Sequence, residues 1–129
     1  MKKLLLSILL STYAFCDISI FISHHNKLSK VSHKDLANLY LKKTNTIHGI
    51  KVIPIDSKNK KIFQEFYKKI VKKSPSQLHA YWIKQIYTGK TQPPKKLSKA
   101  ELKNAMKKNS HIIAYDRNPK TGRILLTIK

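Results

Sequence analysis

The sequence predicts a small α/β fold, because short apolar segments with strand composition alternate with amphipathic segments of helical period. Four runs rich in isoleucine and bounded by polar residues have the length and composition of strands, namely 18–23, 51–55, 111–115 and 124–128. Four stretches between them carry apolar residues at helical spacing. We therefore expect about four strands and four helices in a small three-layer arrangement.

The first half of the chain predicts two strand-to-helix units. After the first strand, Ser32 and Asp35 form a capping-box pair, and Leu36, Leu39 and Tyr40 fall on one helix face. A loop at 45–49 then leads into the second strand. An apolar stripe predicts the next helix, which we expect to end near Lys72 and Lys73; its members are Ile62, Phe63, Phe66, Tyr67 and Ile70.

The second half predicts two further helices and two strands. Ser74 with Pro75 and Gln77 is a helix-start signal, and Gly89 is a stop signal for that helix. The stretch 90–96, which contains two prolines, predicts an exposed linker. Ser98 with Glu101 opens a fourth helix. The strand at 111–115 follows, and a turn at 118–122 leads into the last strand.

Several segments occur in an order that is typical of one protein family. They are Asp35–Lys43, Lys51–Asp56, Ile62–Tyr67, Ser76–Trp82, Ile86–Gly89 and Ile113–Tyr115. This order resembles the phosphate-type periplasmic substrate-binding proteins of ABC transporters, which are type II periplasmic binding proteins, and in particular their second lobe. The likeness covers residues 17–116. It implies a secreted, non-enzymatic protein that binds phosphate or a similar oxyanion without a cofactor, with an ABC permease as its partner.

The first sixteen residues predict an export signal. Lys2 and Lys3 precede an apolar core too short to span a bilayer, and Ala14 and Cys16 place small residues before a cleavage point at Asp17. Residues 17–129 then form one periplasmic domain without cysteine. Acylation of Cys16, which would make the protein a lipoprotein, is the less favoured alternative because bulky Phe15 precedes it.

The charge of the chain is extreme. It contains 27 lysine and arginine residues against 6 acidic ones, and residues 17–129 keep a net charge of +19 because only Lys2 and Lys3 are lost from the total of +21. The lysines are dispersed, which is typical of a solvated basic surface but also favours attraction to polyanions. Only Arg117 and Arg123 are arginine, so sequence-specific nucleic-acid recognition is not expected. The alternative to a small-anion binder is therefore a basic module that binds an anionic envelope component or a protein partner.

Two places follow a predicted strand with polar residues suited to an oxyanion. Ser23 and its neighbours come after the first strand, and a richer set stands between the second strand and the next helix, comprising Ser57, Lys58, Asn59, Lys60 and Lys61. Free N–H groups at a helix start, a hydroxyl and ammonium groups all favour an anion. Ser57 and Asn59 would equally serve an ordinary helix cap.

The family that the chain resembles carries its oxyanion-binding hydroxyls and amides at the turn matched by Ser57–Lys61. That turn is usually rich in small residues, whereas this one contains no glycine. Full binding proteins also close two lobes around the ligand, and the first lobe has no counterpart before Asp17. We therefore expect weak binding of small anions, because an open site is screened by water and salt.

Catalysis is not expected. His24 and His25 are adjacent in an extended segment and point to opposite faces. The other histidines, which are His33, His48, His79 and His111, show no metal-ligand spacing with them. Nucleophile-elbow, P-loop and dinucleotide motifs do not occur in the sequence. Tyr81 and Trp82 have the spacing of core residues rather than of a stacking platform.

Overall fold

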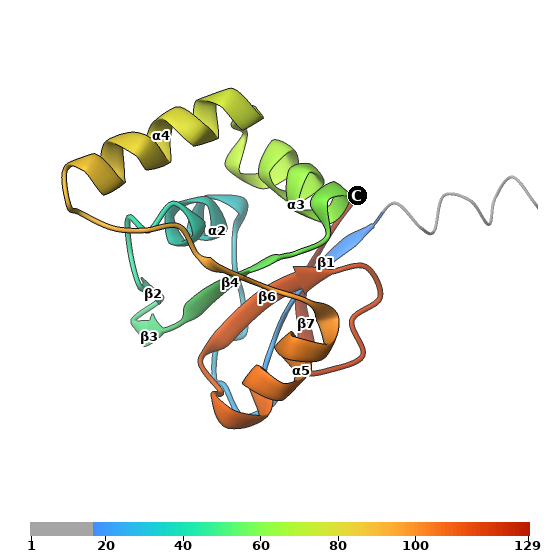
Figure 1. Cartoon of the computed structure of the whole chain (residues 1–129). Coiled ribbons are helices and arrows are strands. Elements are labelled where there is room, and N and C mark those ends of the chain that lie inside the picture. Colours follow the sequence, from blue (N-terminus) through green and yellow to red (C-terminus); the bar gives the residue numbers. More distant parts are fainter. Residues whose placement is uncertain (1–16) are drawn as a thin grey trace, which may run out of the picture.

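A computed structural model describes residues 17–129, which form a mixed five-stranded sheet with helices on both faces (Figure 1). The strand order is β5-β4-β6-β1-β7. In chain order the strands are β1 (Ile18–Ile22), β4 (Ile53–Ser57), β5 (Lys95–Leu97), β6 (Ile112–Asp116) and β7 (Arg123–Ile128). Strand β4 pairs in parallel with β5 and β6, whereas β1 is antiparallel to β6 and β7. The carboxyl end of β1 therefore lies at the opposite edge of the sheet from the carboxyl ends of the other four.

The helices are α2 (His33–Tyr40), α3 (Lys60–Phe66), α4 (Pro75–Tyr87) and α5 (Lys99–Lys108). Helix α3 continues into a π-helical turn, Tyr67–Val71, which ends at Lys72 in the left-handed conformation (φ 60°). Capping boxes open α2, α4 and α5 at Ser32, Ser74 and Ser98, as their sequence signals predict.

The sheet is apolar on both faces, because successive side chains along a strand point to opposite faces and those on both faces are apolar. In β6, Ile113 and Tyr115 pack into a core with α2, the π turn and α4. Ile112 and Ala114 face the other way and pack against α5. Three layers result, with α2, α3 and α4 on one face and α5 on the other (Figure 1). The predicted fold class is confirmed.

Two predicted loops contain strands. The stretch 90–96 does not remain a linker throughout, because Lys95–Leu97 forms β5, which pairs with β4 from Ile55 to Ser57. Lysine and proline are common at the exposed edge of a sheet, where they discourage further pairing, and this explains the polar composition of the segment. The loop at 45–49 belongs to a hairpin of β2 (Thr46–Ile47) and β3 (Ile50–Lys51).

The predicted export signal, residues 1–16, lies outside the described residues. Along 17–129, none of the helices combines the length and the apolar character that crossing a membrane requires.

Candidate anion-binding site

The turn Ser57–Lys61 joins the carboxyl end of β4 to the start of α3. The side chain of Asn59 caps the helix, since its Oδ1 accepts from the N–H of Ile62 (3.1 Å). The Ser57 Oγ accepts from the N–H of Asn59 (3.0 Å), so it holds the turn in shape. Asn59 thus acts as a helix cap and Ser57 stabilises the turn before it, in agreement with the capping alternative from the sequence.

This turn still has donors to offer. Among residues 17–129, no protein acceptor bonds to the backbone N–H groups of Lys60 and Lys61, which are the first two residues of α3. The hydroxyl hydrogen of Ser57 is also uncommitted, because its oxygen acts only as an acceptor. Ser57 is half-buried and Lys58 to Lys61 are exposed. The free donors therefore belong to exposed or half-buried residues at the positive end of the helix dipole.

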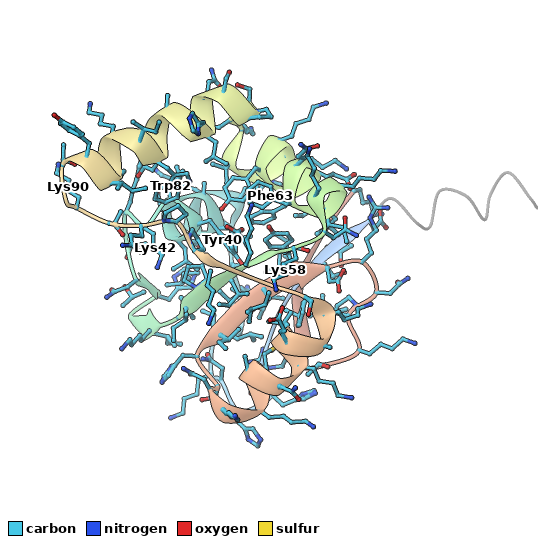
Figure 2. The ribbon with its side chains drawn as sticks, in the orientation of Figure 1. Tyr40, Lys42, Lys58, Phe63, Trp82 and Lys90 are labelled. Atoms are coloured by element: carbon cyan, nitrogen blue, oxygen red, sulfur yellow. The ribbon has the colours of Figure 1, made fainter. Side chains whose placement is uncertain are left out.

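The lysines of the turn differ in their availability. Lys58 Nζ lies 2.7 Å from Glu101 Oε1 on α5, and hydrogen bonding to Lys58 is the main cause that lowers the pKa of Glu101 to about 2. Lys60 and Lys61 have no carboxylate within 4 Å in the described part of the chain. These two ammonium groups are the ones left for an anion. Figure 2 labels Lys58 near the segment that leads from β5 into α5.

A buried carboxylate lies directly behind the turn. Asp56 is 3% exposed, and it accepts hydrogen bonds from the hydroxyls of Tyr67 (2.8 Å) and Tyr115 (2.9 Å). Tyr115 in turn accepts from the N–H of Ser57 (3.3 Å). A chain of hydrogen bonds thus links the buried acid to the first residue of the turn.

Burial controls the ionisation of this cluster. It raises the pKa of Asp56 to about 7, although the bonds from Tyr67 and Tyr115 and the charges of Lys96 and Lys42 act in the opposite direction. Burial, and then the charge of Asp56, also raise the pKa of both tyrosines, which stay protonated as donors. Asp56 is therefore a neutral or negative group, depending on pH, within one residue of the candidate site.

Arg117 is a further charge at the same edge, because it follows the carboxyl end of β6. Its Nη2 lies 2.8 Å from Glu65 Oε2 on α3. Its Nε is buried, and no partner for it exists within residues 17–129. One of the chain's two arginines therefore has an uncommitted buried donor beside α3.

Ser23 is not part of this arrangement. It follows β1 and lies at the other edge of the sheet, because Ile22 pairs with Ile113 while Ser19 pairs with Asp116. Ser23 is 7% exposed, and its Oγ accepts from the N–H of His25 (3.3 Å). The structure therefore brings together Ser57 to Lys61 and separates Ser23 from them.

Sequence reasoning gave no role in the candidate site to Asp56, Tyr67, Tyr115 or Arg117. Asp56 offered one signal, since it is one of only six acidic residues and directly follows an apolar strand. Its tyrosine partners are 11 and 59 residues away, so their approach depends on the tertiary fold. Among residues 17–129, no three histidine, cysteine or acidic side chains gather as a metal site would require.

The fold is similar to that of phosphate receptors. A phosphate ABC transporter substrate-binding protein from Clostridium perfringens, described as putative and solved with bound phosphate, aligns with a TM-score of 0.55 and 10% identity over 76% of this chain and 38% of that one. An ABC-type phosphate transport receptor from Vibrio cholerae aligns with a TM-score of 0.51 and 9% identity over 84% and 44%. No protein-family model and no curated protein matches the sequence. The chain thus has a fold similar to part of these substrate-binding proteins, and it spans about two fifths of their length.

Proposed function

We propose that this protein binds phosphate or a similar oxyanion at the turn Ser57–Lys61, without catalysing a reaction. The observation that carries the proposal is the set of free donors on this turn, which comprises two backbone N–H groups, the Ser57 hydroxyl and the ammonium groups of Lys60 and Lys61. Such a set at a helix start is a general anion site. The likeness of the fold to two phosphate receptors supports the choice of ligand.

The proposal extends to where the protein works. Export through residues 1–16 would deliver the domain 17–129 to the periplasm, where an ABC permease is the natural partner of a phosphate receptor. Lys58 is a secondary contact in this proposal because Glu101 competes for it. Ser23 is not included, since it lies at the opposite edge of the sheet.

The test is to follow amide chemical shifts by NMR while inorganic phosphate or sulfate is added to residues 17–129. Shift changes should centre on Ser57 to Lys61 and should saturate. The double variant Ser57→Ala/Lys60→Glu should abolish them, whereas His24→Ala should leave them intact. Unchanged shifts in the double variant would remove this turn from consideration.

A second candidate function is binding of a polyanion by the dispersed lysines, and the net charge of +19 on residues 17–129 favours it. Titration with phosphate and with a long polyanion at two salt concentrations separates the two functions. A polyanion that releases many counterions should bind with a steep salt dependence, whereas an ion held in an organised site should bind with a shallow one. Saturable phosphate binding with little salt dependence would reject the polyanion function as the main one.

A further inference from the structure

A large groove lies outside the candidate anion site, between the helical segment 60–71 and α4. Its volume is about 720 Å³, which is within the range of small-molecule sites. Phe63, Tyr67, Leu78 and Trp82 provide its apolar walls. Figure 2 labels Phe63 on α3 and Trp82 on α4. No residue of the turn Ser57–Lys61 lines it, so the groove is a separate feature.

The charge around the groove has one sign. Lys68, Lys72 and Lys73 line it, and no aspartate or glutamate does. Within the described residues, none of these three ammonium groups has a carboxylate within 4 Å. Lys73 lies instead over the ring of Tyr81, 5.5 Å from its centroid. An apolar cleft rimmed by unpaired cations is complementary to an apolar body with an anionic head.

The apolar surface extends beyond the groove along α4. Ile83 and Ile86 are each 53% exposed. At 100° per residue, Ile86 falls on the same face as Trp82 and Ile83 on the adjacent row. Leu78 and Ile86 lie eight residues apart on α4, so this track is about 12 Å long. Its length suits an extended chain better than a compact ion.

We propose that this groove binds a small anionic amphiphile, with the apolar chain along α4 and a carboxylate or phosphate head at Lys68, Lys72 and Lys73. A second copy of the protein is the weaker occupant, because two domains of net charge +19 repel each other. A flat membrane surface fits poorly, since the apolar side chains Phe63, Tyr67 and Leu78 line a hollow rather than a protruding face.

The chain carries its own reporter for this site, because Trp82 is its only tryptophan and lines the groove. Dodecanoate below its micellar concentration should change the Trp82 fluorescence saturably. Acetate, which has the head alone, and dodecyltrimethylammonium, which has the chain with a cationic head, should have little effect. Equal responses to dodecanoate and the cationic amphiphile would overturn the charge assignment and with it the proposal.

Variants of the protein test where the carboxylate head and the apolar tail of dodecanoate bind. Lys68→Glu/Lys72→Glu should weaken dodecanoate binding by about tenfold or more, because it replaces both attractive charges with repulsive ones. Lys84→Glu/Lys108→Glu makes the same change of net charge on the far face of α4 and on α5, and should weaken binding by less than about twofold. Equal losses in the two variants would show that dodecanoate follows net charge only, which contradicts the proposal. Ile86→Glu should also weaken binding, and an unchanged affinity would contradict the placement of the chain.

Two further measurements exclude the other occupants. Binding to vesicles that contain phosphatidylglycerol, without a response to free dodecanoate, would make this face a membrane surface and overturn the proposal. A dimer in sedimentation that Ile83→Glu abolishes would do the same in favour of a second copy. Phosphate-induced shifts at Ser57 to Lys61 should survive in Lys68→Glu/Lys72→Glu, so the two sites can fail independently.

Discussion

The carboxyl ends of β1 and β4 lie at opposite edges of the sheet, called here the first and the second edge. Similar residues follow the two strands, but they make different contacts. At the carboxyl end of β1, a serine and an asparagine follow an apolar strand, as they do at the carboxyl end of β4. At the first edge, Asn26 donates to the carbonyl of Ser110 (2.9 Å) and accepts from the N–H of Leu28 (2.9 Å). At the second edge, Asn59 caps a helix whose first two N–H groups stay free. The difference teaches that an anion site depends on the donors left over after folding, rather than on the residue types present.

The largest expected effect concerns the carboxylate behind the second edge. The pKa of Asp56 is about 7 in the folded protein, above its ordinary value of 3.8. Folding therefore favours its protonated form, so its ionisation lowers the free energy of unfolding as pH rises from about 4 to about 7, after which the loss is complete. The loss should reach no more than about 4 kcal/mol. Urea unfolding of the wild type between pH 4 and pH 8 measures it.

Asp56→Asn is the matched control, because an amide keeps the shape and cannot ionise. The substitution leaves every other ionisable group in place, so the informative quantity is the difference between the two proteins. That difference should grow in favour of Asp56→Asn as pH rises. A difference independent of pH would mean that Asp56 ionises normally in the folded protein.

A second effect should appear at the first edge, at Gly122. It adopts φ 75°, and a Cβ there would collide with the carbonyl oxygen of Ile22. Gly122→Ala should therefore lower the free energy of unfolding by about 3 kcal/mol, from backbone strain and the steric clash together. Gly49→Ala is the control, because Gly49 has φ 79° but a Cβ there would meet no atom within 4 Å beyond its chain neighbours; it should cost about 1 kcal/mol. Equal losses in thermal or urea unfolding would contradict the clash.

A third comparison replaces each of the two asparagines by alanine in a separate variant. Asn26→Ala removes two hydrogen bonds of a 7% exposed side chain and should cost about 2 kcal/mol of stability with no change in phosphate binding. Asn59→Ala removes an exposed helix cap and should cost about 1 kcal/mol. It should also weaken the phosphate response, since the free N–H groups lose their fixed helix start. NMR titration of both variants tests this contrast, and a weakened response in Asn26→Ala alone would reverse the roles that we give the two edges.

The sequence allowed most of the fold to be predicted, but only part of the grouping of residues at the candidate site. Capping boxes and apolar stripes are local signals, so α2, α4 and α5 begin where Ser32, Ser74 and Ser98 indicate. Strand β5 was missed because Lys95 and Lys96 show no apolar pattern. They form an edge strand only because they pair with β4 in the folded protein. Strand direction has no local signal either.

That missing direction explains why Ser23 seemed equivalent to Ser57. Nothing within Ile18–Ile22 shows that β1 runs antiparallel to its neighbours, so the two serines could not be assigned to opposite edges. The long-range bonds from Tyr115 to Asp56 and from Ser57 to Tyr115 are equally invisible in a linear pattern. Residues at strand ends are therefore predictable as candidates, whereas their grouping is a property of the tertiary fold.

The smallest expected effect concerns Lys58, which Glu101 holds at 2.7 Å. Glu101→Gln removes the competing charge, and glutamine keeps the capping box with Ser98, so α5 should start as before. The freed ammonium should strengthen phosphate binding at the Ser57–Lys61 turn by about twofold or less, because exposed ion pairs are weak and screened. The gain should vanish in high salt, and the chemical shift of the Lys58 amide should then respond to phosphate more strongly than in the wild type. Suppose that Glu101→Gln left phosphate binding unchanged at low salt, while Ser57→Ala/Lys60→Glu still abolished it. Lys58 would then lie outside the site, and the free charges that distinguish the second edge would be those of Lys60 and Lys61 alone.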